Sequence, residues 1–193
     1  GIGGKMEVSV RGSDMAVYSI KKPGCYQTLW KYVDKVHTIS ESLLSLSKEQ
    51  GMPASIPYVK IFPAIDIGVF KSYNPNFSQK DKLVSMTIGR LHWIKGFIST
   101  LEALAIIKAQ GFDFIYKIIG EGEEYERIAF AAFQLGLKEN VQFLGKMSHS
   151  EVQKELEKAD IYLQYSIEEG FCNAVLEAQA MGKLCIVSKA GGL

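Results

Sequence analysis

The sequence is poor in cysteine and contains neither a long apolar run nor a large charge of one sign. Its three cysteines, Cys25, Cys172 and Cys185, are too few and too scattered for a disulfide framework or a zinc site. This scarcity favours a reducing, cytoplasmic setting. No run of about 18 apolar residues is present, so we expect no membrane-spanning helix. The first residues also lack the charged start and apolar stretch of a signal peptide.

The charge balance gives no sign of a nucleic-acid partner. Lysine and arginine number 22 against 21 acidic residues in a chain of 193, which leaves a formal charge of +1. Hydrophobic residues make up 47%, enough for a substantial core. The chain begins without Met and stops in the loop Ala190 to Leu193, after which a helix would be expected. We therefore expect it to be a fragment.

Strand and helix patterns divide the chain into two blocks. In the first, apolar spacing predicts strands and helices in turn. The predicted strands are 7–10, 36–40 and 58–62, and the predicted helices are about 26–36 and 41–50. Residues 68–82 contain Asn74, Pro75 and Asn76 and resemble a linker.

The second block alternates strands and helices more regularly. Strands are predicted at 83–88, 114–119, 141–144, 161–165 and 184–187, with helices at about 95–110, 123–135, 150–158 and 173–181. The strands are short apolar runs, as expected where both faces of a parallel sheet are covered. The pattern predicts an α/β fold with a doubly wound parallel sheet, whose ligand lies beyond the carboxyl ends of the strands.

Charged residues and glycines do follow the predicted strands. Arg90 and Lys95 lie five positions apart at a helix start, where two cations and free N–H groups suit a diphosphate. The alternative is a pair of solvated surface cations. The next two strands are followed by Gly120-Glu121-Gly122 and by Gly145-Lys146-Met147. Both are weaker signals, because glycine is common at such turns without any ligand.

The segment after the fourth strand is the most informative. Glu169 lies on the loop and Glu177 eight positions later in the helix, with backbone N–H groups from Phe171 to Asn173 between them. Ionised carboxylates suit sugar hydroxyls, because they accept hydrogen bonds from two neighbouring O–H groups. The alternative is that these acids only favour the helix dipole or are ordinary helix residues.

Taken in order, these motifs resemble glycosyltransferase family 4, a group of retaining, metal-independent enzymes with the GT-B fold. The resemblance runs from about Val8 to the last residue. It implies the end of an acceptor domain at 1–70 (a partial Rossmann-like domain), a linker at 71–82, and most of a nucleotide-sugar donor domain at 83–193. The donor domain is a doubly wound, Rossmann-like sheet.

The resemblance also implies roles for single residues. Arg90 and Lys95 match the pair that binds the donor diphosphate. Glu177 matches the acid that binds the ribose, and Glu169 matches the acid at the transferred sugar. The remaining donor-binding positions that it implies are Gly89, Gly120, Gly122, Gly145, Lys146, Met147, Gly170, Phe171, Cys172 and Asn173. No metal ion and no cofactor beyond the nucleotide-sugar substrate are implied. Many family members place a His where this chain has Arg11, so that role is unassigned and Arg11 or Asp14 faces the cleft instead.

We therefore expect a retaining glycosyltransferase that moves a sugar from a nucleoside diphosphate to a saccharide or lipid-linked acceptor, as in polysaccharide biosynthesis. The alternatives are a donor-binding fragment without turnover, which we expect of this chain alone, and a GT-B sugar epimerase. A nicotinamide dehydrogenase is disfavoured because Gly120-Glu121-Gly122 lacks the third glycine of the dinucleotide fingerprint. Any peripheral contact with the inner face of a membrane is expected through the acceptor domain.

Overall fold

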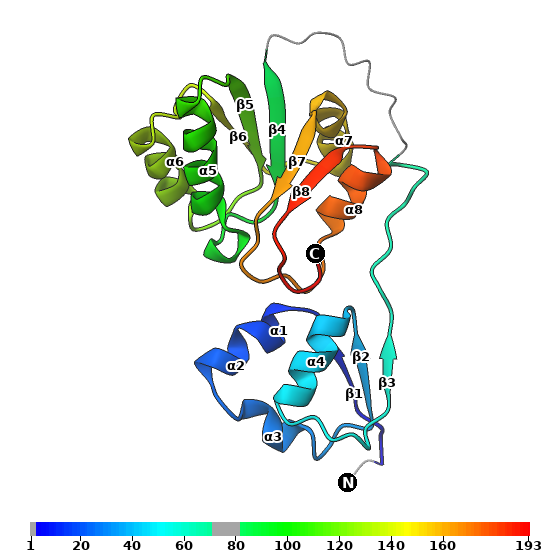
Figure 1. The fold of residues 1–193 in the computed structure, drawn as a ribbon. Coiled ribbons are helices and arrows are strands. Elements are labelled where there is room, and N and C mark those ends of the chain that lie inside the picture. The colour runs from blue at the N-terminus through cyan, green and yellow to red at the C-terminus, as the bar shows by residue number, and fades with distance from the viewer. Residues whose placement is uncertain (1–2, 71–81) are drawn as a thin grey trace. The chain divides into compact units, whose positions relative to one another are not determined.

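The computed structural model describes residues 3–70 and 82–193, and the chain separates into two compact units (Figure 1). The smaller unit comprises Gly1–Ala64, Glu168–Cys172 and Lys189–Leu193. The larger comprises Ile65–Ile167 and Asn173–Ser188. Of the predicted linker at 71–82, all but the last residue lies outside the described residues.

The smaller unit is built on a parallel sheet of three strands in the order β1-β2-β3. These strands are β1 (Glu7–Val10), β2 (Lys35–Thr38) and β3 (Tyr58–Lys60). Its helices are α1 (Ser13–Ala16), α2 (Tyr18–Lys21), α3 (Cys25–Leu29) and α4 (Glu41–Glu49). The predicted helix at 41–50 is confirmed, and it begins where the Ser40 side chain accepts a hydrogen bond from the Leu43 N–H.

The helix predicted at 26–36 is wrong in extent, because α3 ends at Leu29. Of the apolar positions in the predicted helix, Trp30 and Val33 are buried by the turn that leads into β2, whereas Tyr32 is exposed. The Asp34 carboxylate accepts a hydrogen bond from the Met6 N–H at 2.7 Å and fixes this turn. A spacing of three residues is compatible with either arrangement, so the pattern alone could not separate them.

The larger unit is a doubly wound parallel sheet in the order β6-β5-β4-β7-β8, which confirms the predicted α/β fold. Its strands are β4 (Leu83–Ile88), β5 (Phe114–Ile119), β6 (Val141–Gly145), β7 (Ile161–Gln164) and β8 (Leu184–Val187). The strand order reverses at β4, which pairs with β5 on one side and β7 on the other. Ligands of such sheets bind at this reversal, beyond the carboxyl ends of the strands.

Helices cover the larger sheet as right-handed crossovers require. They are the 3-10 turn η1 (Trp93–Lys95) and helices α5 (Phe97–Ala109), α6 (Tyr125–Gln134), α7 (His149–Lys158) and α8 (Asn173–Ala180). Figure 1 shows α5 and α6 beside β5 and β6, and α7 and α8 beside β7 and β8. Leu101 of α5 and Ile128 of α6 meet Tyr116 of β5 in a buried core. In the part of the chain that the structure describes, no helix combines the length and the apolar character needed to cross a bilayer.

Candidate functional site

Backbone hydrogen bonds join the loops that follow β4, β5 and β6. The Gly89 N–H donates to the Ile119 carbonyl at 2.9 Å, and the Gly120 N–H donates to the Gly145 carbonyl at 2.8 Å. The Leu91 N–H adds a third bond to the Glu121 carbonyl at 2.9 Å. Three segments that the sequence predicted to bind one ligand are therefore held together at one edge of the sheet.

The close approach of these loops explains two of their glycines without any ligand. A Cβ atom at Gly120 would overlap the Gly89 carbonyl oxygen, and one at Gly122 would overlap the Leu91 carbonyl oxygen. Gly120 also has a φ of +141°, which side chains rarely adopt. Both glycines shape the site by letting its loops touch.

The predicted cations lie on the loop from β4 into α5. The Lys95 side chain passes over Gly89, where a Cβ atom would lie 3.7 Å from its Cδ and Cε atoms. Arg90 is exposed. His92 holds the loop between them, because its Nδ1 accepts a hydrogen bond from the Ile94 N–H at 3.3 Å. The predicted diphosphate-binding cations thus stand on a loop whose backbone is fixed.

Both ring nitrogens of His92 have a polar neighbour within this loop region. With Nδ1 as an acceptor, the ring proton of the neutral imidazole lies on Nε2, which is 3.5 Å from a Glu123 carboxylate oxygen. Nearby, the Lys146 ammonium lies 3.3 Å from the Glu121 carboxylate. Both partners of this second pair are largely exposed, so it adds little stability.

Glu177, the predicted ribose-binding acid, is half-buried on α8. Burial raises the pKa of its carboxyl, and the neighbouring His149 acts in the opposite direction. His149 begins α7, and its ring centroid lies 6.5 Å from that of the buried Phe70. A carboxylate at the edge of an apolar environment forms strong hydrogen bonds with hydroxyl donors. Asn173, the first residue of α8, is exposed.

A buried polar network fixes the carboxyl end of β7. The Tyr162 hydroxyl donates to the Gln164 side-chain oxygen at 3.0 Å, and the Gln164 amide donates to the Ser166 hydroxyl at 3.0 Å. The Ser188 hydroxyl donates to the Ser166 carbonyl at 2.7 Å and ties in the end of β8. These bonds hold the start of the segment that carries Glu169, and no pattern in the sequence indicated them.

The structure places four of the predicted residues, Glu169 to Cys172, in the smaller unit. A Cβ atom at Gly170 would lie 2.7 Å from the Arg11 carbonyl oxygen, so this glycine permits backbone packing. Phe171 packs on the core of the smaller unit, and its ring centroid lies 6.2 Å from that of Phe62. The other ten predicted residues lie in the larger unit.

Arg11, which stands where many family members have a His, forms a local turn with Asp14. The Asp14 carboxylate accepts hydrogen bonds from the Gly12 N–H at 2.6 Å and from the Arg11 N–H at 3.2 Å. Asp14 therefore shapes the turn between β1 and α1. Within residues 3–70 and 82–193, no three His, Cys, Asp or Glu side chains gather in a group able to hold a metal ion.

Two solved structures share the fold of this chain. HepE of Anabaena, solved in complex with UDP-glucose, matches with a TM-score of 0.81 and 20% identity over 97% of this chain and 54% of its own. Sucrose-phosphate synthase of Thermosynechococcus elongatus matches with a TM-score of 0.77 and 18% identity, covering 93% and 47%.

The chain belongs to the family described as glycosyl transferases group 1, whose family model matches residues 70–193. A phosphatidylinositol N-acetylglucosaminyltransferase subunit from Arabidopsis thaliana is 27% identical over 162 residues, or 84% of this chain and 34% of that protein. The amylovoran biosynthesis glycosyltransferase AmsK of Erwinia amylovora is 32% identical over 56% of this chain and 28% of its own length. The chain spans about a third of the length of these relatives.

Proposed function

We propose that this chain carries the donor site of a retaining glycosyltransferase of family 4. The reaction moves a hexosyl-type sugar from a nucleoside diphosphate to a saccharide or lipid-linked acceptor. Membership of the glycosyl transferases group 1 family supports the transfer chemistry. The relatives that act on a phosphatidylinositol and in amylovoran biosynthesis support the two kinds of acceptor.

One observation carries this proposal. The loops after β4, β5 and β6 are joined by backbone hydrogen bonds at the edge of the sheet where ligands of this fold bind. The same unit holds Lys95 on the first of these loops and the half-buried Glu177 on α8. Such a unit offers cations for a diphosphate and a carboxylate for ribose hydroxyls.

The chemistry explains why fixed cations matter. As the bond between the anomeric carbon and the diphosphate breaks, negative charge builds on the leaving oxygen. Arg90 and Lys95 would stabilise this charge, and preorganised donors of this kind act most strongly where charge develops. The roles of Glu169 to Cys172 at the sugar and phosphate remain predictions from the family resemblance.

For this chain alone we propose nucleotide binding with little or no transfer. Catalysis requires both walls of the cleft to exclude water and position the acceptor, and the chain matches about a third of the length of its relatives. Binding is therefore the property to measure first.

UDP, GDP or ADP should raise the thermal midpoint of this chain. A ligand at 100 times its dissociation constant stabilises a protein by about 2.7 kcal/mol, which corresponds to roughly 5–10 °C for a domain of this size. We expect one of the three nucleotides to produce the shift and Glu177→Ala to abolish it. Differential scanning fluorimetry measures both, and the nucleotide that acts identifies the base.

The matched control is Gln179→Ala, which changes an exposed residue of the same helix. This variant should keep the full shift. If no nucleotide shifts the midpoint of the folded chain, or if Glu177→Ala keeps the shift, the donor-site proposal is wrong.

Nucleotide affinity should fall as the pH falls through the raised pKa of Glu177. Burial raises the pKa of Glu177 above its ordinary value, so the carboxylate takes up a proton at a higher pH than an exposed glutamate does. Protonation removes the charged acceptor of the ribose hydroxyls, so binding is strongest above this pKa and weakens as the pH falls through it. Calorimetric titration of wild type and Glu177→Gln isolates the effect, because the phosphate groups titrate equally in both. Equal pH profiles for the two proteins would contradict the assigned role.

A further inference from the structure

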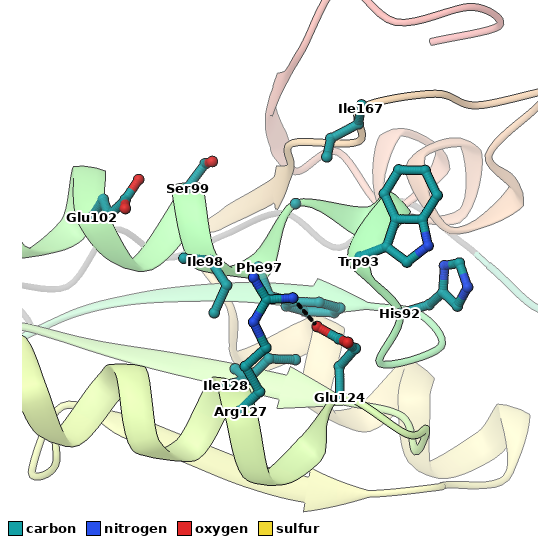
Figure 2. Close-up of a pocket in the computed structure, with 11 residues that line it drawn as sticks. His92, Trp93, Phe97, Ile98, Ser99, Glu102, Glu124, Arg127, Ile128 and Ile167 are labelled. Atoms are coloured by element: carbon teal, nitrogen blue, oxygen red, sulfur yellow. Dashed lines mark hydrogen bonds and ion pairs between the residues drawn. The ribbon is translucent and has the colours of Figure 1, made fainter.

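A cavity lies in the larger unit, between the first turns of α5 and α6 (Figure 2). Its volume is about 420 Å³, within the range of about 300–1,000 Å³ typical of ligand pockets. No residue predicted at the donor site lines it. The lining residues used below are Trp93, Ser99, Glu102, Glu124, Arg127 and Ile167.

Part of the cavity wall is apolar and exposed. Trp93 is 46% exposed and Ile167 is 55% exposed, so both side chains are accessible to a ligand. The backbone between them is fixed, because the Ile167 N–H donates to the Ile94 carbonyl at 2.8 Å. An accessible indole ring on a fixed loop can stack against the C–H face of a sugar ring.

The rest of the lining supplies planar, charged hydrogen-bonding groups. An Arg127 guanidinium nitrogen lies 2.8 Å from a Glu124 carboxylate oxygen, and Figure 2 shows this pair facing the space beside Phe97. The pair orients the guanidinium, whose other N–H groups can donate to a ligand. Glu102 and Ser99 of α5 add a carboxylate and a hydroxyl. These groups match the paired hydroxyls of a sugar.

The charge of the lining decides against an anionic ligand. Glu102 and Glu124 outweigh Arg127, so a phosphate or a nucleotide would meet net negative charge. An apolar lipid chain would offer no hydrogen-bond partner to the Glu102 carboxylate or to the remaining N–H groups of Arg127. A neutral ring with hydroxyls on its rim and C–H groups on its face satisfies both parts of the lining.

We propose that this cavity binds a neutral saccharide. Resting on the function proposed above, the saccharide is a unit of the acceptor, so the acceptor includes sugar rings beyond the one that receives the transferred sugar. Trp93 stacks on the ring, and Glu102, Glu124 and Arg127 bind its hydroxyls.

Tryptophan fluorescence tests this directly, because the chain has only two tryptophans. Trp30 is 4% exposed, so a neutral quencher such as acrylamide acts mainly on Trp93. The probes are the methyl glycosides of glucose, galactose, mannose and N-acetylglucosamine, and disaccharides of these sugars, at millimolar concentration. A bound sugar should lower the quenching constant about two-fold, because it covers one face of the indole.

Two cavity variants and one control give the test its specificity. Glu102→Gln and Arg127→Ala should lose the protection, whereas Glu126→Gln, at an exposed acid of α6 outside the cavity, should keep it. Circular dichroism of each variant establishes that it is folded. If no saccharide protects Trp93 in the folded wild type, or if both cavity variants are still protected, the proposal is overturned.

The nucleotide measurements separate this proposal from the donor site. If a nucleotide shifts the thermal midpoint but no saccharide protects Trp93 from quenching, the donor-site proposal is supported and the saccharide-site proposal is wrong. Protection without any nucleotide shift supports the saccharide site and overturns its assignment to an acceptor. Protection of Trp93 by UDP alone would make the cavity part of a nucleotide site and would also overturn the proposal.

Discussion

Replacing Gly120 with alanine is expected to lower the free energy of unfolding of the larger unit by about 3 kcal/mol or more. The added Cβ atom would overlap the Gly89 carbonyl oxygen, and the backbone at this position has a φ of +141°. Neither partner can give way easily, because the Gly89 and Gly120 N–H groups are both bonded to neighbouring strand ends. The substitution should therefore push apart the loops after β4 and β5.

Thermal and urea unfolding followed by circular dichroism measure this effect. A loss of about 3 kcal/mol should lower the midpoint on the order of 10 °C. Gly89→Ala is the matched control in the same site, since its Cβ atom would make only ordinary contacts with the Lys95 side chain at 3.7 Å. Equal midpoints for the two variants would show that the loops do not touch as described.

Lys95→Ala should weaken binding of the nucleoside diphosphate about 10- to 100-fold, the loss expected for a hydrogen bond to a charged group. The same variant should bind the nucleoside without phosphates as well as wild type does. Glu177→Ala, in contrast, should weaken both ligands, because the ribose is common to them. Isothermal titration of the nucleoside and of its diphosphate against wild type, Lys95→Ala and Glu177→Ala distinguishes binding of the phosphates from binding of the ribose.

In a polypeptide that transfers sugar, the same change acts on the chemical step. Loss of one preorganised charge-stabilising donor costs about 2.7–4 kcal/mol, so kcat should fall about 10²- to 10³-fold for Lys95→Ala or Arg90→Ala. Release of the nucleoside diphosphate measures this rate. If Lys95→Ala loses affinity for the nucleoside as strongly as for its diphosphate, Lys95 does not bind the phosphates.

Much of the larger unit could be predicted because its strands are short, mainly apolar runs. The runs at 83–88, 114–119 and 184–187 coincide with β4, β5 and β8, and each helix predicted between strands in this block is present. The first block was harder to predict. Its helices α1 and α2 have four residues each, too short to show a helical repeat.

The site could be predicted only as a list of residues at strand ends. The sequence could not show that Gly120 serves contact between loops, because that depends on how closely β4 and β5 approach. Nor could it show the cavity at Trp93, which forms where α5 packs beside α6. The position of Glu169 to Cys172 with the smaller unit likewise depends on tertiary packing of Gly170 and Phe171.

The reversal of strand order at β4 also bears on how the chain is synthesised. A ribosome delivers β4, β5 and β6 before β7 and β8, and local crossovers can assemble these three strands as they emerge. The edge of β4 that pairs with β7 has no partner strand until β7 is synthesised. At this junction the Val84 N–H donates to the Asp160 carboxylate, which lies 76 residues later in the chain. Until then, an apolar strand edge stays open to other chains. Translation speed between residues 88 and 161 should therefore affect the soluble yield more than the same change made after β8.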